Sequence, residues 1–329
     1  SARLFSTAVL NALTPRFTLK TEHDDGIRTK RIFWIDDLVT DKLVQGLDEG
    51  VVTAEAMSIS RDLADLPGNV CTPAYLAEAV QNAAAGMTTV EVEVLDEHQI
   101  EELGMGAFLS VAKGSTVPPR FIAIRYRGTN AALPPVAFVG KGITFDTGGI
   151  SLKPAANMAD MTYDMSGAAV VIGTVMAAAR AKLPVNLLGV VAACENLPSG
   201  SAAKPGDVVT SLSGKTIEIL NTDCEGRMIL ADALTWTARQ KPELIIDAAT
   251  LTGACCVALG APYSGLFTSD DALAYDLIKA GRDSLDDVWC LPVGAEYAKL
   301  MKTPAADIAN QATVRDGGAS SAAAFLSVF

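Results

Sequence analysis

The spacing of hydrophobic residues along this chain switches repeatedly between a helical and an extended pattern. Over residues 41–66, apolar side chains recur mostly every three to four positions, which predicts a helix that Gly46 or Gly50 could interrupt. Residues 90–94 alternate valine with glutamate, which predicts a strand exposed on one face. The same patterns predict strands at 32–35, 90–94, 120–126, 136–139, 185–191 and 244–247, and helices at 41–66, 74–85, 97–103, 167–181 and 228–239.

The order of these elements predicts an α/β fold with a mixed, largely parallel sheet flanked by helices. The runs at 136–139 and 185–191 are continuously apolar, as expected of strands covered on both faces. Residues 208–220 predict a hairpin around Ser213-Gly214. The uncharged stretch 248–268 is long enough for a membrane span, but its glycines and Pro262 favour a strand, a turn and a second strand, so no membrane segment is expected.

Composition narrows the class of protein. Apolar residues make up 50% of the 329 positions and charged residues 19%, so there is enough material for a core and disorder is excluded. The formal net charge of −12 argues against nucleic acid or an anionic membrane surface as the main partner. The six cysteines contain no Cys-x-x-Cys pair, which favours a reducing, cytoplasmic compartment. The two histidines lie far apart in sequence, which argues against a histidine zinc site or a Ser-His-Asp triad.

A glycine-rich polar segment follows the apolar run at 136–139. Lys141 lies between two glycines and Asp146 precedes two more, which predicts a tight loop after a strand that ends at Val139. Functional groups of open α/β sheets gather at the carboxyl ends of strands. The segment is Gly-Lys-Gly-Ile-Thr-Phe-Asp-Thr-Gly-Gly-Ile-Ser-Leu-Lys over residues 140–153, with Asp164 downstream.

A second polar segment, Asn-Thr-Asp-Cys-Glu-Gly-Arg at 221–227, precedes a predicted helix. In an extended chain Asp223, Glu225 and Arg227 would share one side and Cys224 would point to the other. Several carboxylates without histidine indicate a metal held by oxygen ligands, such as Mg²⁺, Mn²⁺ or Zn²⁺. From these residues alone the substrate stays open, and a carboxylate-metal phosphohydrolase fits as well as a peptidase.

Together the two segments resemble the leucyl aminopeptidase family, the cytosolic two-metal aminopeptidases. Residues 221–227 match the family motif Asn-Thr-Asp-Ala-Glu-Gly-Arg except at Cys224, where alanine is usual, and residues 140–153 match the family's Gly-Lys-Gly block. The similarity runs from about residue 54 to the end. It implies a zinc-exopeptidase-like catalytic domain over residues 51–329, with residues 1–50 as the tail of an N-terminal domain plus a linker.

The resemblance implies two divalent ions, zinc or manganese, in each subunit. Asp146 and Glu225 would bridge both ions, and Asp223 would complete the more labile site. Lys141, as a neutral amine, and Asp164 would complete the tighter one.

Further roles follow from the same resemblance. Lys153 would polarise the peptide carbonyl, and Arg227 would hold a bicarbonate that acts as general base. The residues implied to line the substrate pocket are Met161, Asn221, Thr250, Leu251 and Gly253.

The function implied is removal of N-terminal residues, Leu-like ones preferred, from peptides by metal-activated water in a homo-hexamer. A DNA-binding or regulatory relative and a catalytically incomplete relative are the alternatives. The helix predicted from Gly317 reaches Phe329 without a termination signal, and the family continues further. We therefore expect the sequence to be a piece of a longer chain.

Overall fold

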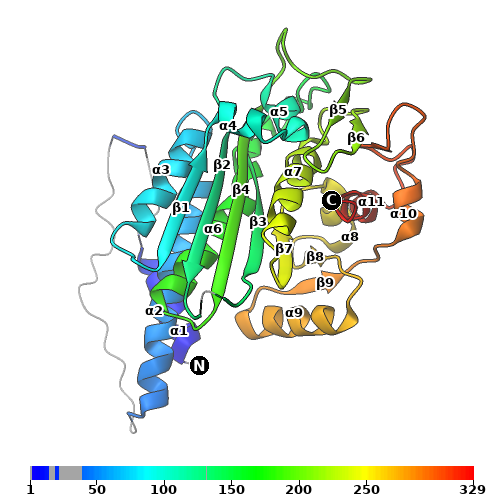
Figure 1. Cartoon of the computed structure of the whole chain (residues 1–329). Helices are drawn as coiled ribbons and strands as arrows, with labels where there is room; N and C mark the ends of the chain where they lie inside the picture. Colours follow the sequence, from blue (N-terminus) through cyan, green and yellow to red (C-terminus); the bar gives the residue numbers. More distant parts are fainter. Residues whose placement is uncertain (1, 15–18, 22–38, 131) are drawn as a thin grey trace.

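A five-stranded sheet forms the centre of the protein (Figure 1). The computed structural model describes residues 2–14, 19–21, 39–130 and 132–329, so the strand predicted at 32–35 lies outside the described residues. The strand order across the sheet is β1 (Val90–Leu95), β2 (Arg120–Arg127), β4 (Asn186–Asn196), β3 (Val136–Asp146) and β7 (Leu244–Ala248).

Most strands of this sheet run in one direction. β3 pairs in parallel with both β4 and β7. β2 is antiparallel to both β1 and β4, so β1 shares the direction of the parallel strands. The predicted mixed, largely parallel sheet is therefore confirmed. At the carboxyl ends of β3 and β4, Asp146 pairs with Asn196.

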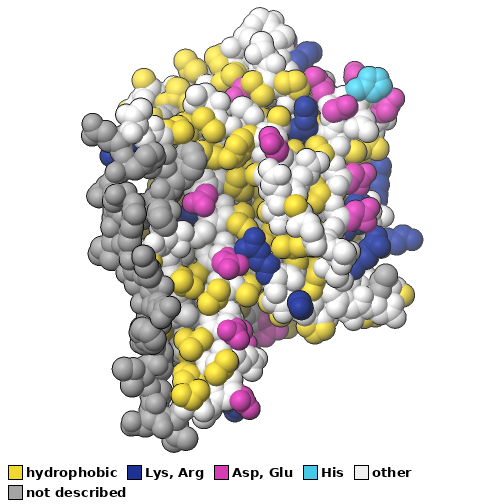
Figure 2. Space-filling view, turned by 90° about the vertical axis from the view of Figure 1, so that its left-hand side faces the viewer, with side chains coloured by type: hydrophobic (Ala, Val, Ile, Leu, Met, Phe, Trp, Pro, Cys, Tyr) yellow, Lys and Arg dark blue, Asp and Glu magenta, His cyan; other side chains and the backbone are white. Residues whose placement is uncertain are grey.

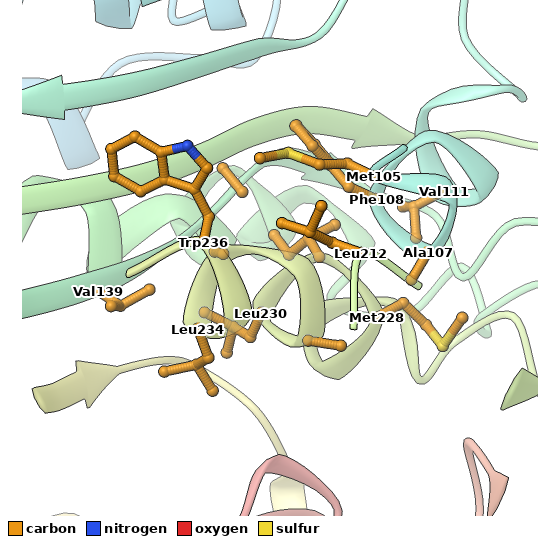
Figure 3. Close-up of a cluster of buried hydrophobic side chains, with 14 of the residues drawn as sticks. Met105, Ala107, Phe108, Val111, Val139, Leu212, Met228, Leu230, Leu234 and Trp236 are labelled. Carbon is orange, nitrogen blue, oxygen red and sulfur yellow. The ribbon is translucent and has the colours of Figure 1, made fainter. Parts of the chain in front are cut away.

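Helices cover both faces of the sheet and create two cores. Alternate residues of β2 enter each core: Phe121 contributes to the first and Ile122 to the second. In the first core, Trp236 and Leu230 of one helix lie near Phe108 of another (Figure 3). The first core contains α5 (Gly106–Ala112), α7 (Glu225–Arg239) and α11 (Gly318–Leu326), and the second contains α3 (Pro73–Ala84), α6 (Ser166–Arg180) and the end of α2 (Asp41–Ala64).

The two N-terminal helices pack against each other. The Ser6 hydroxyl of α1 (Ala2–Leu13) donates to the carbonyl of Leu47 in α2, over a distance of 3.0 Å. The helix α2 continues through Gly46 and Gly50 without a break, and at Gly50 a β-carbon would meet Ser6. Because the expected boundary between residues 50 and 51 falls inside this helix, the division of the chain into 1–50 and 51–329 stays a prediction.

The remaining elements are short, and one of them corrects a prediction. The hairpin predicted at 208–220 is present as β5 and β6. The stretch 248–268 contains a helix before its strand, because the Thr252 hydroxyl accepts from the amide of Cys255 and caps a helix there. These elements are α4 (Glu97–Glu102), the 3₁₀ helix η1 (Met158–Met165), β5 (Val208–Thr210), β6 (Thr216–Glu218), α8 (Gly253–Leu259), β8 (Ser264–Leu266), α9 (Asp271–Ser284), β9 (Val288–Cys290), α10 (Ala295–Lys299) and β10 (Ile308–Ala309).

The distribution of surface charges and the one long apolar helical stretch bear on the expectations of no nucleic-acid and no membrane partner. On the face shown in Figure 2, Lys and Arg side chains lie among Asp, Glu and hydrophobic side chains rather than in one basic stripe. Within the described residues, one helical stretch, Met158–Arg180, is long and apolar enough to span a membrane by composition. Its most apolar window is 61% buried, and α6 within it packs on the sheet as a core helix.

The start of α6 lies unusually close to the sheet. A β-carbon on Gly140 of β3 would lie 2.7 Å from both Ala168 Cα and the Gly167 carbonyl oxygen, and one on Gly167 would lie 2.1 Å from the Ala248 carbonyl oxygen. The glycines thus allow α6 to begin against β3 and β7. This contact places Asp164, two residues before α6, next to the middle of β3.

The substitution Gly140→Ala tests this close approach. We expect it to lower the free energy of unfolding by about 1–3 kcal/mol, because the obstructing atoms belong to the backbone and cannot rotate away. Urea unfolding at pH 7 is the measurement. Gly200→Ala is the matched control, since a β-carbon there meets nothing within 4 Å. Equal stability of the two variants would contradict the tight packing.

Candidate metal centre

The strand β3 carries both Lys141 and Asp146. The predicted end at Val139 and the predicted loop around Lys141 are wrong, because β3 continues to Asp146. Gly140 lies against α6 and Gly142 lies against β4, and neither forms a turn. Five positions along a regular strand would place the two side chains on opposite faces. The pairing with β4 shifts by one residue between Ile143 and Phe145, so Lys141 and Asp146 pair with Ala192 and Asn196, four positions apart. The irregularity therefore brings both side chains to one face.

Glu225 and Arg227 lie in the first turn of α7, which begins three residues before the predicted helix start. The predicted extended alternation of Asp223, Glu225 and Arg227 is therefore wrong. Two residues along a helix differ in direction by about 200°. Arg227 consequently points away from Glu225, and its Nη1 donates to the carbonyl of Asn310 over 2.8 Å.

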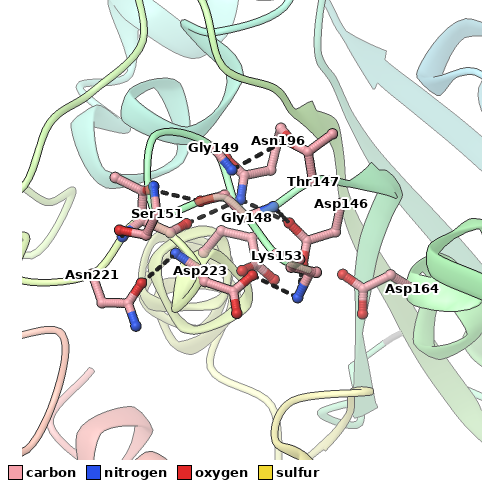
Figure 4. Close-up of polar contacts among 12 residues, drawn as sticks. Asp146, Thr147, Gly148, Gly149, Ser151, Lys153, Asp164, Asn196, Asn221 and Asp223 are labelled. Carbon is pink, nitrogen blue, oxygen red and sulfur yellow. Dashed lines mark hydrogen bonds and ion pairs between the residues drawn. The ribbon is translucent and has the colours of Figure 1, made fainter. Parts of the chain in front are cut away.

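Three buried carboxylates converge between the ends of these elements. One oxygen each of Asp146, Asp164 and Glu225 lies within 4.8 Å of the others. The three residues come from the end of β3, from η1 and from the start of α7. Asp223, which is less buried, is joined to Asp146 through Lys153, whose amine contacts both carboxylates (Figure 4). The structure thus brings together the four predicted carboxylates, three from the two motifs and the fourth from Asp164.

Lys141 neutralises one side of this cluster. Its amine lies 2.7 Å from Asp164 Oδ1 and 2.7 Å from Glu225 Oε1, and it donates to the Thr250 carbonyl. Burial opposes the charge on Lys141, but the two carboxylates outweigh burial and raise the pKa of the amine. Burial raises the pKa of Glu225 as well, opposed by Lys141 and reinforced by Asp146 and Asp164. Among these side chains alone Lys141 is therefore an ammonium, unlike the neutral amine that a metal ligand requires.

Lys153 neutralises the other side. Its amine lies 2.7 Å from Asp146 Oδ2 and 2.5 Å from Asp223 Oδ1. Burial opposes this charge too, and hydrogen bonds to the two carboxylates raise the pKa of the amine. The side chain of Lys153 is 21% exposed, compared with 3% for Lys141. Lys153 can therefore meet a molecule that enters the site, whereas Lys141 is sealed behind the carboxylates.

The motifs left one important residue out of the prediction. Asn196, at the end of β4, donates from Nδ2 to Asp146 Oδ1 over 2.8 Å and to the Thr222 carbonyl over 3.0 Å. Its carbonyl accepts from the amide and hydroxyl of Thr147. Asn196 thus fixes Asp146 relative to the 221–227 segment. Its position at the carboxyl end of a buried strand was the signal available in the sequence.

The residues implied to line a pocket divide into two groups. The Thr250 hydroxyl donates to Asp164 Oδ1, and Asn221 Oδ1 accepts from the amide of Asp223, so both contact the cluster's residues. No hydrogen bond or ion pair within the described residues links Met161, Leu251 or Gly253 to the carboxylates. Of these three, Leu251 packs against the first core.

The donor set fits divalent metal ions. Asp164 Oδ2 and Glu225 Oε2 are buried and have no hydrogen-bond partner among the described residues. Orphaned buried carboxylate oxygens are costly unless a cation satisfies them. Asp146, Asp164, Asp223 and Glu225 supply oxygen ligands of the type that Zn²⁺, Mn²⁺ and Mg²⁺ accept, and Lys141 lies within reach of two of them.

Comparison of the sequence with known protein families identifies the family of this chain. The family described as "Cytosol aminopeptidase family, catalytic domain" matches residues 58–329. The chain belongs to this family. Its membership confirms the resemblance carried by the two motifs and agrees with the α/β architecture observed.

Individual relatives are identical to the chain at about half of the aligned positions. A probable cytosol aminopeptidase of Azoarcus sp. (strain BH72) is 55% identical over 295 residues, which cover 90% of this chain and 59% of the relative. A probable cytosol aminopeptidase of Bordetella pertussis (strain Tohama I) is 54% identical over 314 residues, which cover 94% of this chain and 63% of the relative. The chain therefore spans about three fifths of the length of these curated relatives.

A solved structure shares the fold over the whole chain. The bottromycin maturation enzyme BotP superposes with a TM-score of 0.86 at 34% sequence identity, covering 100% of this chain and 69% of that one. The arrangement of the sheet and helices is thus shared with that enzyme.

Metal binding should release protons from this site. Lys141 is held as an ammonium by Asp164 and Glu225, and a metal ligand must give up its proton, so we expect release of about one proton or more per chain at pH 7. Calorimetric titration with Mn²⁺ in two buffers of different ionisation enthalpy measures this number. Lys141→Gln is the control, since an amide has no proton to lose. Binding of Mn²⁺ by the parent chain without release of a proton would contradict this role of Lys141.

Proposed function

We propose that this catalytic domain is a two-metal aminopeptidase that removes N-terminal residues, with Leu-like residues preferred. The observation that supports this proposal most directly is the convergence of four carboxylates with one sealed and one accessible lysine. In this proposal Asp146 and Glu225 would hold two zinc or manganese ions as shared ligands. Asp223 completes one site, and Lys141 and Asp164 complete the other.

The side chains divide the work of binding and orienting a peptide. Bound ions supply Lewis acidity and lower the pKa of a coordinated water. Lys153 is charged and accessible, so it donates to the carbonyl oxygen of the bond to be cleaved. The cluster of carboxylates favours a free α-amine over an acylated one. These preferences together favour cleavage of the first residue of a peptide.

Arg227 lies beside this centre without joining the carboxylates. It is buried, and its Nε has no partner among the described residues. We propose that its remaining N–H groups would hold a bicarbonate ion, which would supply a general base. Met161 and Leu251 offer apolar surface, and together with Asn221, Thr250 and Gly253 they are proposed to form the pocket for the first side chain of the substrate.

The same family membership supports a proposal for the cellular location and the oligomeric state. We propose a cytosolic protein that acts on peptides as a homo-hexamer. The names of the relatives support the cytosolic location. The net charge of −12 and the mixed charges on the face in Figure 2 do not favour the DNA-binding alternative.

Hydrolysis of leucine p-nitroanilide beside its N-acetylated analogue tests the proposed reaction. With Mn²⁺ or Zn²⁺ present, we expect cleavage of the free-amine substrate alone, and loss of that cleavage on adding a chelator. Equal cleavage of both substrates would contradict the exopeptidase selectivity. Phosphatase activity without peptidase activity would instead support the phosphohydrolase alternative.

The substitution Asp146→Asn tests the bridging role. We expect it to abolish binding at both metal sites and to lower kcat by about a thousandfold or more, because one side chain serves both ions. Equilibrium dialysis gives the number of ions bound. Glu195→Gln is the control, since Glu195 is a buried carboxylate next to the site that accepts from the Ser115 hydroxyl. Retention of two ions by Asp146→Asn would refute the bridge.

A further inference from the structure

Asn310 lies at the point where the C-terminal part of the chain meets the 221–227 segment. It follows β10, which pairs with β6, and it is fully buried. Its Oδ1 accepts from the amides of Leu220 and Asn221, over 2.8 Å and 3.2 Å. Its Nδ2 donates to the Asn221 carbonyl over 2.7 Å. One neutral side chain therefore holds three backbone groups at the start of the second motif.

The backbone of the same residue holds the other end of the motif. The Asn310 carbonyl accepts from Arg227 Nη1 over 2.8 Å, and the Asn310 amide donates to the Glu218 carbonyl over 2.9 Å. The guanidinium of Arg227 also lies over the ring of Phe325 in α11, 6.0 Å from the ring centroid. Two residues of the C-terminal segment, Asn310 and Phe325, therefore hold the guanidinium of Arg227 in place.

A chain of contacts connects Asn310 to the carboxylates. Asn310 fixes the backbone of Asn221, and Asn221 Oδ1 accepts from the amide of Asp223 over 2.8 Å. Asp223 in turn contacts Lys153, which also contacts Asp146. A shift of residues 220–221 would therefore move Asp223 relative to the three buried carboxylates.

We propose that Asn310 is a positioning residue that sets both the 220–223 turn and the direction of Arg227. Its effect on turnover rests on the proposed function, while its effect on metal binding does not. An amide suits this role because it offers an acceptor and a donor together without adding charge. Alanine would remove all three side-chain contacts, and aspartate would keep the acceptor but lose the donor.

The substitution Asn310→Ala tests the proposal through three measurements. In the metal-free protein, hydrogen exchange at the amides of Leu220 and Asn221 should become faster by about tenfold or more. Calorimetric titration with Mn²⁺ should show about tenfold weaker binding, as expected when a group that orients a ligand is lost. With leucine p-nitroanilide, kcat should fall by about tenfold and more than KM rises.

Asn186 provides a matched control for the loss of a buried amide. It is 9% exposed, its Oδ1 accepts from the Thr129 amide, and its Nδ2 donates to the carbonyls of Asn130 and Leu133. Asn186 begins β4, about 33 Å along the strand from Asn196 at the site. Asn186→Ala should lose thermal stability to a similar degree while keeping metal affinity and kcat within about twofold of the parent chain.

The outcomes separate this proposal from the proposed function. If Asn310→Ala binds Mn²⁺ like the parent chain and loses only as much stability as Asn186→Ala, the positioning role is overturned. If the parent chain shows no peptidase activity, the proposed function fails, and hydrogen exchange and metal affinity still decide the role of Asn310. If Asn310→Ala does not fold, Asn310→Asp replaces it. Unchanged Mn²⁺ affinity in that variant would overturn the proposal, and weaker Mn²⁺ binding would support it.

Discussion

The repulsion among buried carboxylates is the constraint on which the site depends. Oxygens of Asp146, Asp164 and Glu225 lie within 4.8 Å of one another where water cannot screen them. Lys141 and Lys153 compensate the negative charge, each on one side of the cluster. Glu225 gains further support as the first residue of α7, where the helix dipole favours a negative charge. Divalent ions would satisfy the oxygens that the two lysines leave without a partner.

The fold supplies the rigidity that this charge arrangement requires. The irregular pairing of β3 with β4 turns Asp146 toward Lys141, and the glycine contact between β3 and α6 brings Asp164 up to the same strand. Both features act through the backbone, which the two packed cores prevent from relaxing. The cluster cannot reduce its repulsion by spreading apart, so counter-charges must meet it in place.

Sequence patterns predicted the strands of the sheet and singled out the carboxylates and lysines that the structure brings together, but not the local geometry of either motif. A continuous apolar run marks β4, whose residues are all buried, and the alternation of valine with glutamate marks β1, so the existence of both strands was predictable. Gly140 looked like a loop residue because a close helix contact and a turn demand the same small side chain. Asn310 gave no signal, because the partners that make it important are separated from it by about ninety residues of chain.

Amide side chains recur around the site for a reason that follows from the charge balance. Asn196, Asn221 and Asn310 each fix a backbone or carboxylate group next to the cluster. A carboxylate in any of these places would add to the repulsion, and a lysine would compete with metal ions for the same oxygens. An amide offers donor and acceptor atoms without a charge. The protein thereby positions its charged residues with neutral side chains. The amides leave the net charge of the centre unchanged, so the two lysines and any bound ions balance the carboxylates.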